Sequence, residues 1–130
     1  MLKGIDPILN ADVLYALRAM GHGDDLIIAD TNFPSDSIAC ETVLGSVLRI
    51  DRSAAEVARA VLSVYPLDTF VDDAAARMEV VDEPDTILPV MEEMQQRLAA
   101  LASEPHFAAP TLRAGLEGEG APVLSPQSGE

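Results

Sequence analysis

The sequence predicts an α/β domain in which helices pack on a mainly parallel sheet. Three observations lead to this prediction: apolar residues recur at helical spacing in three segments, short apolar runs lie between those segments, and 48% of the 130 residues are hydrophobic. Helices that alternate with short apolar strands are typical of this class. A chain of this length suits one domain and is too short for two ordinary ones.

The first helix is predicted to begin after Asn10 and to end at Gly21. Asn10 is a residue type that caps a first turn, and Val13, Leu17 and Met20 share one face at helical spacing. Glycine tolerates the left-handed conformation that commonly follows a helix, so we expect Gly21 to adopt it.

Apolar runs without alternation predict the strands. Residues 26–29 are Leu-Ile-Ile-Ala, which predicts a strand buried on both faces that stops at Asp30. An irregular loop is expected at residues 31–34. Further strands are expected at residues 46–50 and near residues 76–81.

Two more helices follow from capping and spacing. Ser53 and Glu56 have the spacing of a capping box, which predicts a second helix that Pro66 stops. A third helix is predicted over residues 90–101. The apolar positions expected to face the core are Val57, Val61 and Val64 in the second helix, and Met91, Met94, Leu98 and Leu101 in the third.

The last part of the chain differs in composition. Residues 105–130 hold four of the eight glycines and four of the nine prolines, and no helix or strand period is visible after Ala114. We therefore expect a domain at residues 1–104 and a flexible or loosely packed tail at residues 105–130.

Charge and cysteine content restrict the classes of partner and compartment. The net charge of −14, from 22 acidic and 8 basic residues, disfavours nucleic acid and anionic membrane surfaces. No apolar run approaches the ~18 residues of a membrane span, and no secretory signal is recognised. The single cysteine, Cys40, excludes an internal disulfide, is expected to be a small half-buried residue, and fits a reducing cytoplasm. We expect a soluble cytoplasmic protein.

The segment Gly21-His22-Gly23-Asp24 is the strongest candidate for chemistry. Histidine exchanges protons near neutral pH, and flanking glycines let a ligand approach the backbone. Asp24 or Asp25 could orient the ring or raise its basicity. Asp30, at the carboxyl end of a predicted strand, lies where ligands bind in open α/β sheets. The alternative is a helix C-cap with a solvated histidine.

Other chemistries have weaker support in the sequence. His22, Asp24 and Asp30 could in principle ligate a divalent ion, but zinc sites usually contain more His or Cys ligands, so no metal is expected. Motifs for metalloproteases, EF-hands, phosphate loops and dinucleotide binding are absent, as is a nucleophile elbow. The second histidine, His106, is expected to belong to the surface or a linker.

Several short motifs together resemble one family. Residues 1–5 are MLKGI, residues 20–24 are MGHGD, and residues 29–34 are ADTNFP; residues 65–70 are YPLDTF, and residues 76–81 are ARMEVV. These resemble the L-fucose mutarotase / D-ribose pyranase (RbsD/FucU-like) family over about residues 1–103, and the later motifs are closer to the fucose branch.

The resemblance implies a fold and an activity. It implies a three-layer α/β/α domain with one central sheet, assembled into ring-like homo-oligomers, that interconverts anomers or ring forms of free monosaccharides without a cofactor. His22 matches the family's catalytic proton donor, and Asp30 matches a carboxylate that binds the sugar.

The chain departs from the family pattern in its last quarter. Family members continue with a basic residue and a Tyr-x-Asn element, whereas this chain has only Tyr15 and Tyr65 and no asparagine after Asn32. We therefore expect that the final strands could be missing, because of divergence, truncation or a frameshift. The functions left open are a fucose-type mutarotase, a D-ribose pyranase, a sugar-binding member with little catalysis, and an acidic interaction module.

Overall fold

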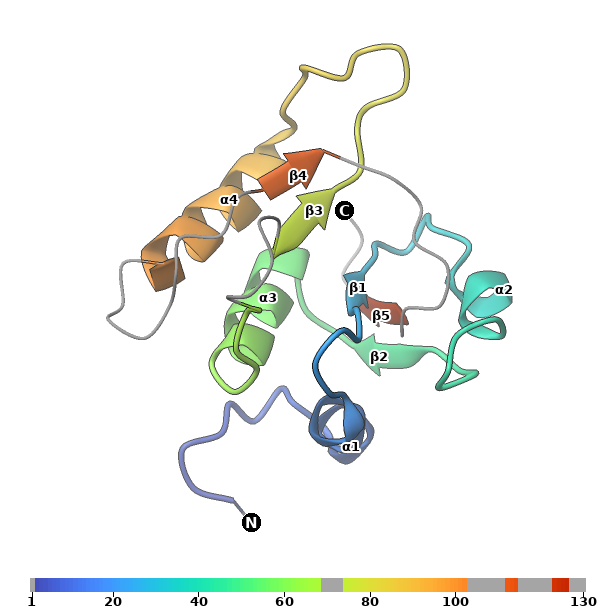
Figure 1. The fold of residues 1–130 in the computed structure, drawn as a ribbon, viewed down its shortest axis with the longest axis vertical. Helices are drawn as coiled ribbons and strands as arrows, with labels where there is room; N and C mark the ends of the chain where they lie inside the picture. The colour runs from blue at the N-terminus through green and yellow to red at the C-terminus, as the bar shows by residue number, and fades with distance from the viewer. Residues whose placement is uncertain (1, 69–73, 103–111, 115–122, 127–130) are drawn as a thin grey trace. The chain divides into compact units, whose positions relative to one another are not determined.

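The computed structural model describes residues 2–68, 74–102, 112–114 and 123–126 (Figure 1). The chain forms two compact units, one of residues 1–65 with 118–130 and the other of residues 66–117. The expected boundary between residues 104 and 105 lies outside the described residues, as does His106.

The first unit contains a three-stranded sheet with the strand order β1-β5-β2. Both pairings are parallel, with Ile27 opposite Val123 and Leu48 opposite Leu124. Figure 1 shows β5 between its two partners, although it comes from the far end of the sequence. The strands of this unit are β1 (Ile27–Ile28), β2 (Leu48–Ile50) and β5 (Val123–Pro126), and its helices are α1 (Ala11–Ala19), α2 (Ser35–Ala39) and α3 (Ala54–Leu62).

The expectation that the last strands are missing is wrong. Two strands lie beyond residue 104, namely β4 (Leu112–Ala114) and β5, and β5 is the middle strand of its sheet. The sequence shows no period for β5 because the strand has only four residues, VLSP, and its pairing partners, β1 and β2, are distant along the chain. Pro126, which lacks an N–H donor, is the last residue of the strand.

Apolar clusters cover both faces of β1. Ile28 packs against the larger cluster, to which α1 and α3 contribute, and Ile27 packs against a smaller one that contains Ala39 of α2. Successive strand side chains point to opposite faces, so the predicted double-sided burial of this strand is confirmed in part: both faces pack against apolar clusters, but Ile27 and Ile28 are half-buried. The buried members of the larger cluster are Leu9, Val13, Ala16, Leu17, Leu48, Ile50, Val57, Ala60 and Val61.

Helix α1 begins as predicted and ends differently. Asn10 caps it: Oδ1 accepts a hydrogen bond from the Val13 N–H at 3.0 Å, and Nδ2 donates to the Arg49 carbonyl at 2.9 Å. The prediction of a left-handed Gly21 is wrong, because the helix ends at Ala19 and the positive φ, +88°, belongs to Gly23.

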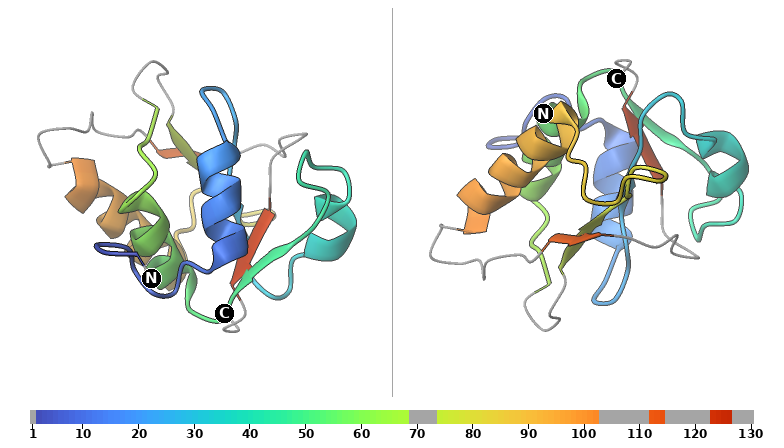
Figure 2. Two further views of the ribbon diagram at one scale, coloured as in Figure 1. Left: turned by 90° about the horizontal axis from the view of Figure 1, so that it is seen from below. Right: turned by 90° about the horizontal axis from the view of Figure 1, so that it is seen from above.

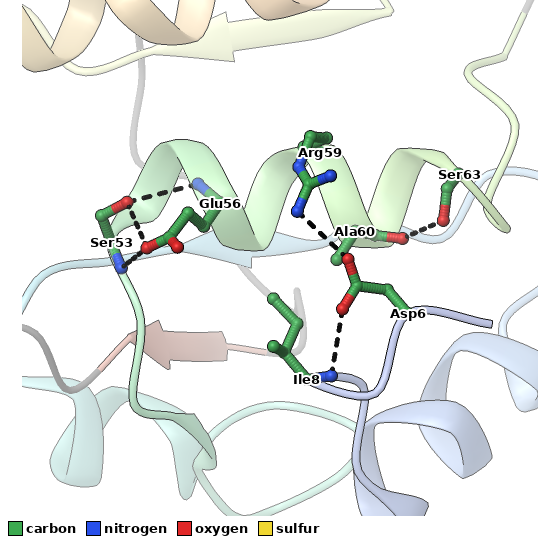
Figure 3. A network of polar contacts seen from close by, with 7 residues as sticks. All are labelled: Asp6, Ile8, Ser53, Glu56, Arg59, Ala60 and Ser63. Atoms are coloured by element: carbon green, nitrogen blue, oxygen red, sulfur yellow. Dashed lines mark hydrogen bonds and ion pairs between the residues drawn. The ribbon is translucent and has the colours of Figure 1, made fainter.

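Helix α3 confirms the predicted capping box (Figure 3). The Ser53 N–H donates to Glu56 Oε2 at 3.0 Å, and the Glu56 N–H donates to Ser53 Oγ at 3.4 Å. Val57 and Val61 are buried, but Val64 lies beyond the end of the helix and is 39% exposed, so its predicted place in the core is wrong.

A second polar contact ties the amino-terminal segment to α3. Arg59 donates to Asp6 Oδ2 at 3.2 Å, and Asp6 Oδ1 accepts from the Ile8 N–H at 3.1 Å (Figure 3). The side chain of Asp6 is only 19% exposed, so solvent screens this ion pair less than a fully exposed one. It fixes the approach of the chain to α1.

Replacement of Glu56 by glutamine is expected to reduce the acid sensitivity of folding. Hydrogen bonds from the Ser53 N–H and hydroxyl lower the pKa of Glu56 below its usual value of 4.5. A carboxyl whose pKa is lower in the folded state stabilises the fold above that usual value, and the contribution is lost as the pH falls through the folded-state pKa. Thermal unfolding should show a stability difference between wild type and Glu56→Gln at pH 7 that shrinks near pH 3; a difference independent of pH would contradict this.

The second unit contains the remaining elements. They are β3 (Ala75–Arg77), which pairs in parallel with β4, and α4 (Pro89–Ala102), whose Leu98 is buried as predicted. The strand expected near residues 76–81 is shorter than predicted, and Val81 is 84% exposed. The chain turns after it, with an isolated bridge between Val80 and Glu83 and a positive φ at Asp82.

The predicted stripe on α4 is confirmed in part. Met91 and Met94 are half-buried beside the buried Leu98, whereas the side chain of Leu101 lies outside the described ones. Among the described residues no helix is long and apolar enough to cross a bilayer.

Candidate functional site

His22 stands on an exposed turn between α1 and β1. Figure 2 shows this connection as the blue loop that leaves the end of α1. The residues on either side of the turn, Met20 and Leu26, are half-buried and pack against the larger apolar cluster. The five residues between them, 21–25, are all exposed, so the imidazole is accessible to a ligand.

Two hydrogen bonds close this turn on itself. The Gly21 N–H donates to Asp24 Oδ2 at 2.7 Å, and the Asp24 N–H donates to the Gly21 carbonyl at 3.2 Å. The first is short, as expected for an N–H that donates to a carboxylate. Asp24 and Asp25 were both candidates to act on His22, and the carboxylate of Asp24 is hydrogen-bonded to the backbone N–H of Gly21.

Asp30 begins a second braced loop at the carboxyl end of β1. Its Oδ1 accepts hydrogen bonds from the N–H groups of Asn32, at 2.9 Å, and Phe33, at 3.0 Å. Phe33 packs against the smaller apolar cluster and so anchors the loop. No described residue donates to the second oxygen, Oδ2, and the side chain is half-buried, so one oxygen of Asp30 can receive a ligand hydroxyl.

The two candidate residues flank β1. His22 precedes the strand and Asp30 follows it, and no described contact joins them. Two hollows in the described surface, of about 440 Å³ along α4 and about 250 Å³ between the start of α1 and the end of β2, are lined by neither residue. A common site for His22 and Asp30 therefore stays a prediction.

The sequence also raised metal binding and Cys40 as candidates. Within the described ranges, no three His, Cys, Asp or Glu side chains gather in a group that could hold a metal ion. Cys40 is exposed, not half-buried as expected, because it follows the last residue of α2; its Sγ donates to the Asp36 carbonyl at 3.1 Å.

The brace at Asp24 is a feature that sequence reasoning missed. Asp24 lies three residues after Gly21, a spacing at which an aspartate side chain can accept a backbone N–H within one turn. Either Asp24 or Asp25 was predicted to act on the imidazole, whereas Asp24 accepts the backbone N–H of Gly21. The available signal was this spacing, an aspartate three residues after a glycine at the end of a helix.

The fold and its loops define an α/β protein with an exposed histidine and a loop-bracing carboxylate at the two ends of one strand. Comparison with known proteins then assigns the chain to a family. The family model described as the RbsD / FucU transport protein family matches residues 3–112. The chain belongs to this family.

Known relatives are mutarotases and sugar-binding proteins. The human fucose mutarotase is 42% identical over 80 residues, which cover 62% of this chain and 51% of the relative. A crystal structure of a protein described provisionally as sugar binding is 47% identical with a TM-score of 0.87, covering 100% of this chain and 89% of that one. The chain spans about half the length of the mammalian fucose mutarotases it matches.

A further solved relative contains a sugar. The fucose mutarotase of Streptococcus pneumoniae in complex with L-fucose is 27% identical to this chain with a TM-score of 0.73. The match covers 97% of this chain and 89% of that one. The likeness therefore extends over nearly all of both chains.

Proposed function

We propose that this protein is an L-fucose mutarotase, an isomerase that interconverts the anomers of the free sugar without a cofactor. The observation that carries the proposal is the pair of braced loops around β1, at residues 21–24 and 30–34, in a chain of this family. The relative solved with L-fucose and the mammalian fucose mutarotases favour this sugar.

His22 would supply the proton transfers. Opening a cyclic hemiacetal removes a proton from the anomeric hydroxyl and delivers one to the ring oxygen; closing the ring on the other face reverses both transfers. An imidazole exchanges protons near neutral pH and can serve as both base and acid. Its place on an exposed turn gives a sugar access to the ring.

Asp30 would hold the sugar. Because Oδ1 is occupied by two loop N–H groups, Oδ2 is the oxygen that accepts a sugar hydroxyl. A hydrogen bond to a carboxylate is stronger than one between neutral groups. A neutral sugar is also indifferent to the net charge of −14.

The proposal extends to architecture and assembly. We expect one central parallel sheet between two helical layers, which is supported by the parallel pairings of the first unit and by the apolar clusters on both faces of β1. We also expect a cytoplasmic homo-oligomer. Because His22 is exposed and a small ligand is usually enclosed on several sides, a second copy is the expected source of another wall.

The experiment is an exchange measurement on the purified 130-residue chain. Saturation-transfer NMR between the two anomeric protons of L-fucose is expected to show exchange that grows with protein concentration. D-ribose, measured in the same way, tests the pyranase alternative. No acceleration with either sugar would overturn the proposed activity.

A second function is favoured by one observation. The chain has only two tyrosines: Tyr15 is 70% exposed on α1, and Tyr65 packs against the larger apolar cluster. Neither belongs to a Tyr-x-Asn element, so sugar binding with little catalysis is the alternative. Calorimetric titration with several monosaccharides, beside the exchange assay, separates the two, because binding without exchange supports the alternative.

A further inference from the structure

The turn that carries His22 lies at the surface. Its five residues, 21–25, are exposed, and Met20 and Leu26, on either side of it, pack against the larger apolar cluster. His22 lies between two glycines, which have the largest conformational freedom of any residue. Without a brace, this stretch could adopt many backbone conformations and would carry the imidazole with it.

Asp24 supplies the brace. Its carboxylate accepts the Gly21 N–H at 2.7 Å while its own N–H donates to the Gly21 carbonyl at 3.2 Å. The two bonds clamp the residue before His22 to the second residue after it. The clamp also holds Gly23 at a φ of +88°, which residues other than glycine rarely adopt.

We infer that Asp24 is a positioning residue for His22, acting through the backbone of the turn and not as a charge partner of the ring. The inference rests on the proposed catalytic role of His22. A displacement of about 1 Å in a reacting group can lower a rate about 10²-fold, so the fixed turn has a direct consequence for rate. The sugar itself would be held elsewhere, at Asp30.

Two substitutions separate the brace from the charge. Asp24→Asn keeps an oxygen that can accept the Gly21 N–H and removes the negative charge. Asp24→Ala removes both. If the brace is the function, Asp24→Asn should stay within about threefold of wild type, whereas Asp24→Ala should lose about 10- to 100-fold in kcat with little change in KM.

The exchange of L-fucose anomers is measured for both variants across pH 5–8. Asp24→Asn is expected to keep the wild-type pH profile, because a brace made of an amide oxygen holds the turn as a carboxylate does. A charge partner of the ring would behave differently, since its removal shifts the profile. Equal losses in the two variants, a shifted profile in Asp24→Asn, or full activity in Asp24→Ala would each overturn the inference.

A readout that needs no activity completes the test. The Gly21 amide is followed by hydrogen exchange in NMR spectra of the free protein. Its protection is expected to persist in Asp24→Asn and to be lost in Asp24→Ala, while thermal unfolding shows that both variants fold. Unchanged protection in Asp24→Ala would overturn the brace itself. Failure of the proposed function is told apart because the wild type would then show no anomer exchange, and failure of the role of His22 because His22→Ala would keep full activity; neither result depends on the protection of the Gly21 amide.

Discussion

Replacement of His22 by alanine is expected to remove the acceleration of L-fucose anomer exchange, a loss of about 10²- to 10⁴-fold. The reason is that the proposed reaction consists of two proton transfers, and the imidazole is the group proposed to make them near neutral pH. Saturation-transfer NMR at matched protein concentrations measures the loss. Because the turn is exposed, the substitution should leave the melting temperature nearly unchanged.

Two further variants make this result specific. His22→Gln keeps a polar side chain of similar size without a proton that exchanges near pH 7, so it should be as inactive as His22→Ala. Arg18→Ala, in the last turn of α1 and exposed, should remain within about twofold of wild type, because surface substitutions away from special features change little. Wild-type exchange rates in His22→Ala would refute the role of this histidine.

Replacement of Asp30 by asparagine is expected to raise the KM for L-fucose by about 10- to 100-fold. Hydrogen bonds to charged groups contribute about 1.5–3 kcal/mol, and the substitution removes the charge from the oxygen proposed to accept a sugar hydroxyl. The amide oxygen can still accept the N–H groups of Asn32 and Phe33, so the loop should keep its conformation. KM and kcat are obtained from exchange rates measured over a range of sugar concentrations.

Two comparisons test that interpretation. Asp30→Ala removes the loop brace as well, so it should lose kcat and thermal stability in addition to affinity. Asp36→Asn makes the same chemical change on α2, where the carboxylate is 84% exposed and forms an ion pair with Arg49, and it should leave KM unchanged. An unaltered KM in Asp30→Asn would remove Asp30 from the sugar site.

The elements predicted correctly from the sequence are those with local signals. Asn10 and Ser53 cap their helices through bonds that span only three residues, so the spacing of side chains was enough to place both helix starts. The strand predicted at residues 26–29 was found, although shorter, as β1 (Ile27–Ile28), because its apolar residues pack against apolar clusters on both faces.

The errors fall where distant or competing contacts decide the structure. Helix α2 is only five residues long and has no side-chain cap, so its sequence contains no signal that predicts where the helix begins. Gly21 was expected to be left-handed, but its N–H donates to the carboxylate of Asp24, and Gly23 takes the positive φ instead. Val64 has the helical spacing of a core residue, yet α3 has already ended at Leu62.

The candidate site was predictable only as a set of residues. The sequence predicted His22 and Asp30 as site residues. The structure adds that the carboxylates of Asp24 and Asp30 each brace a loop by accepting backbone N–H groups. Such roles depend on which oxygen faces which amide, which spacing does not specify. For the same reason, the sequence did not distinguish Asp24 from Asp25 as the residue that could orient the ring of His22.

The position of β5 between β1 and β2 affects how the protein folds during synthesis. Ribosomes make β1 and β2 early, yet the strand that joins them comes from residues 123–126. Until those residues leave the exit tunnel, the two early strands lack their shared partner, and unpaired strand edges favour aggregation. Contacts between residues this far apart along the chain also form slowly. We therefore expect α1 and α3 to collapse first on their shared apolar cluster, with sheet closure as the late step.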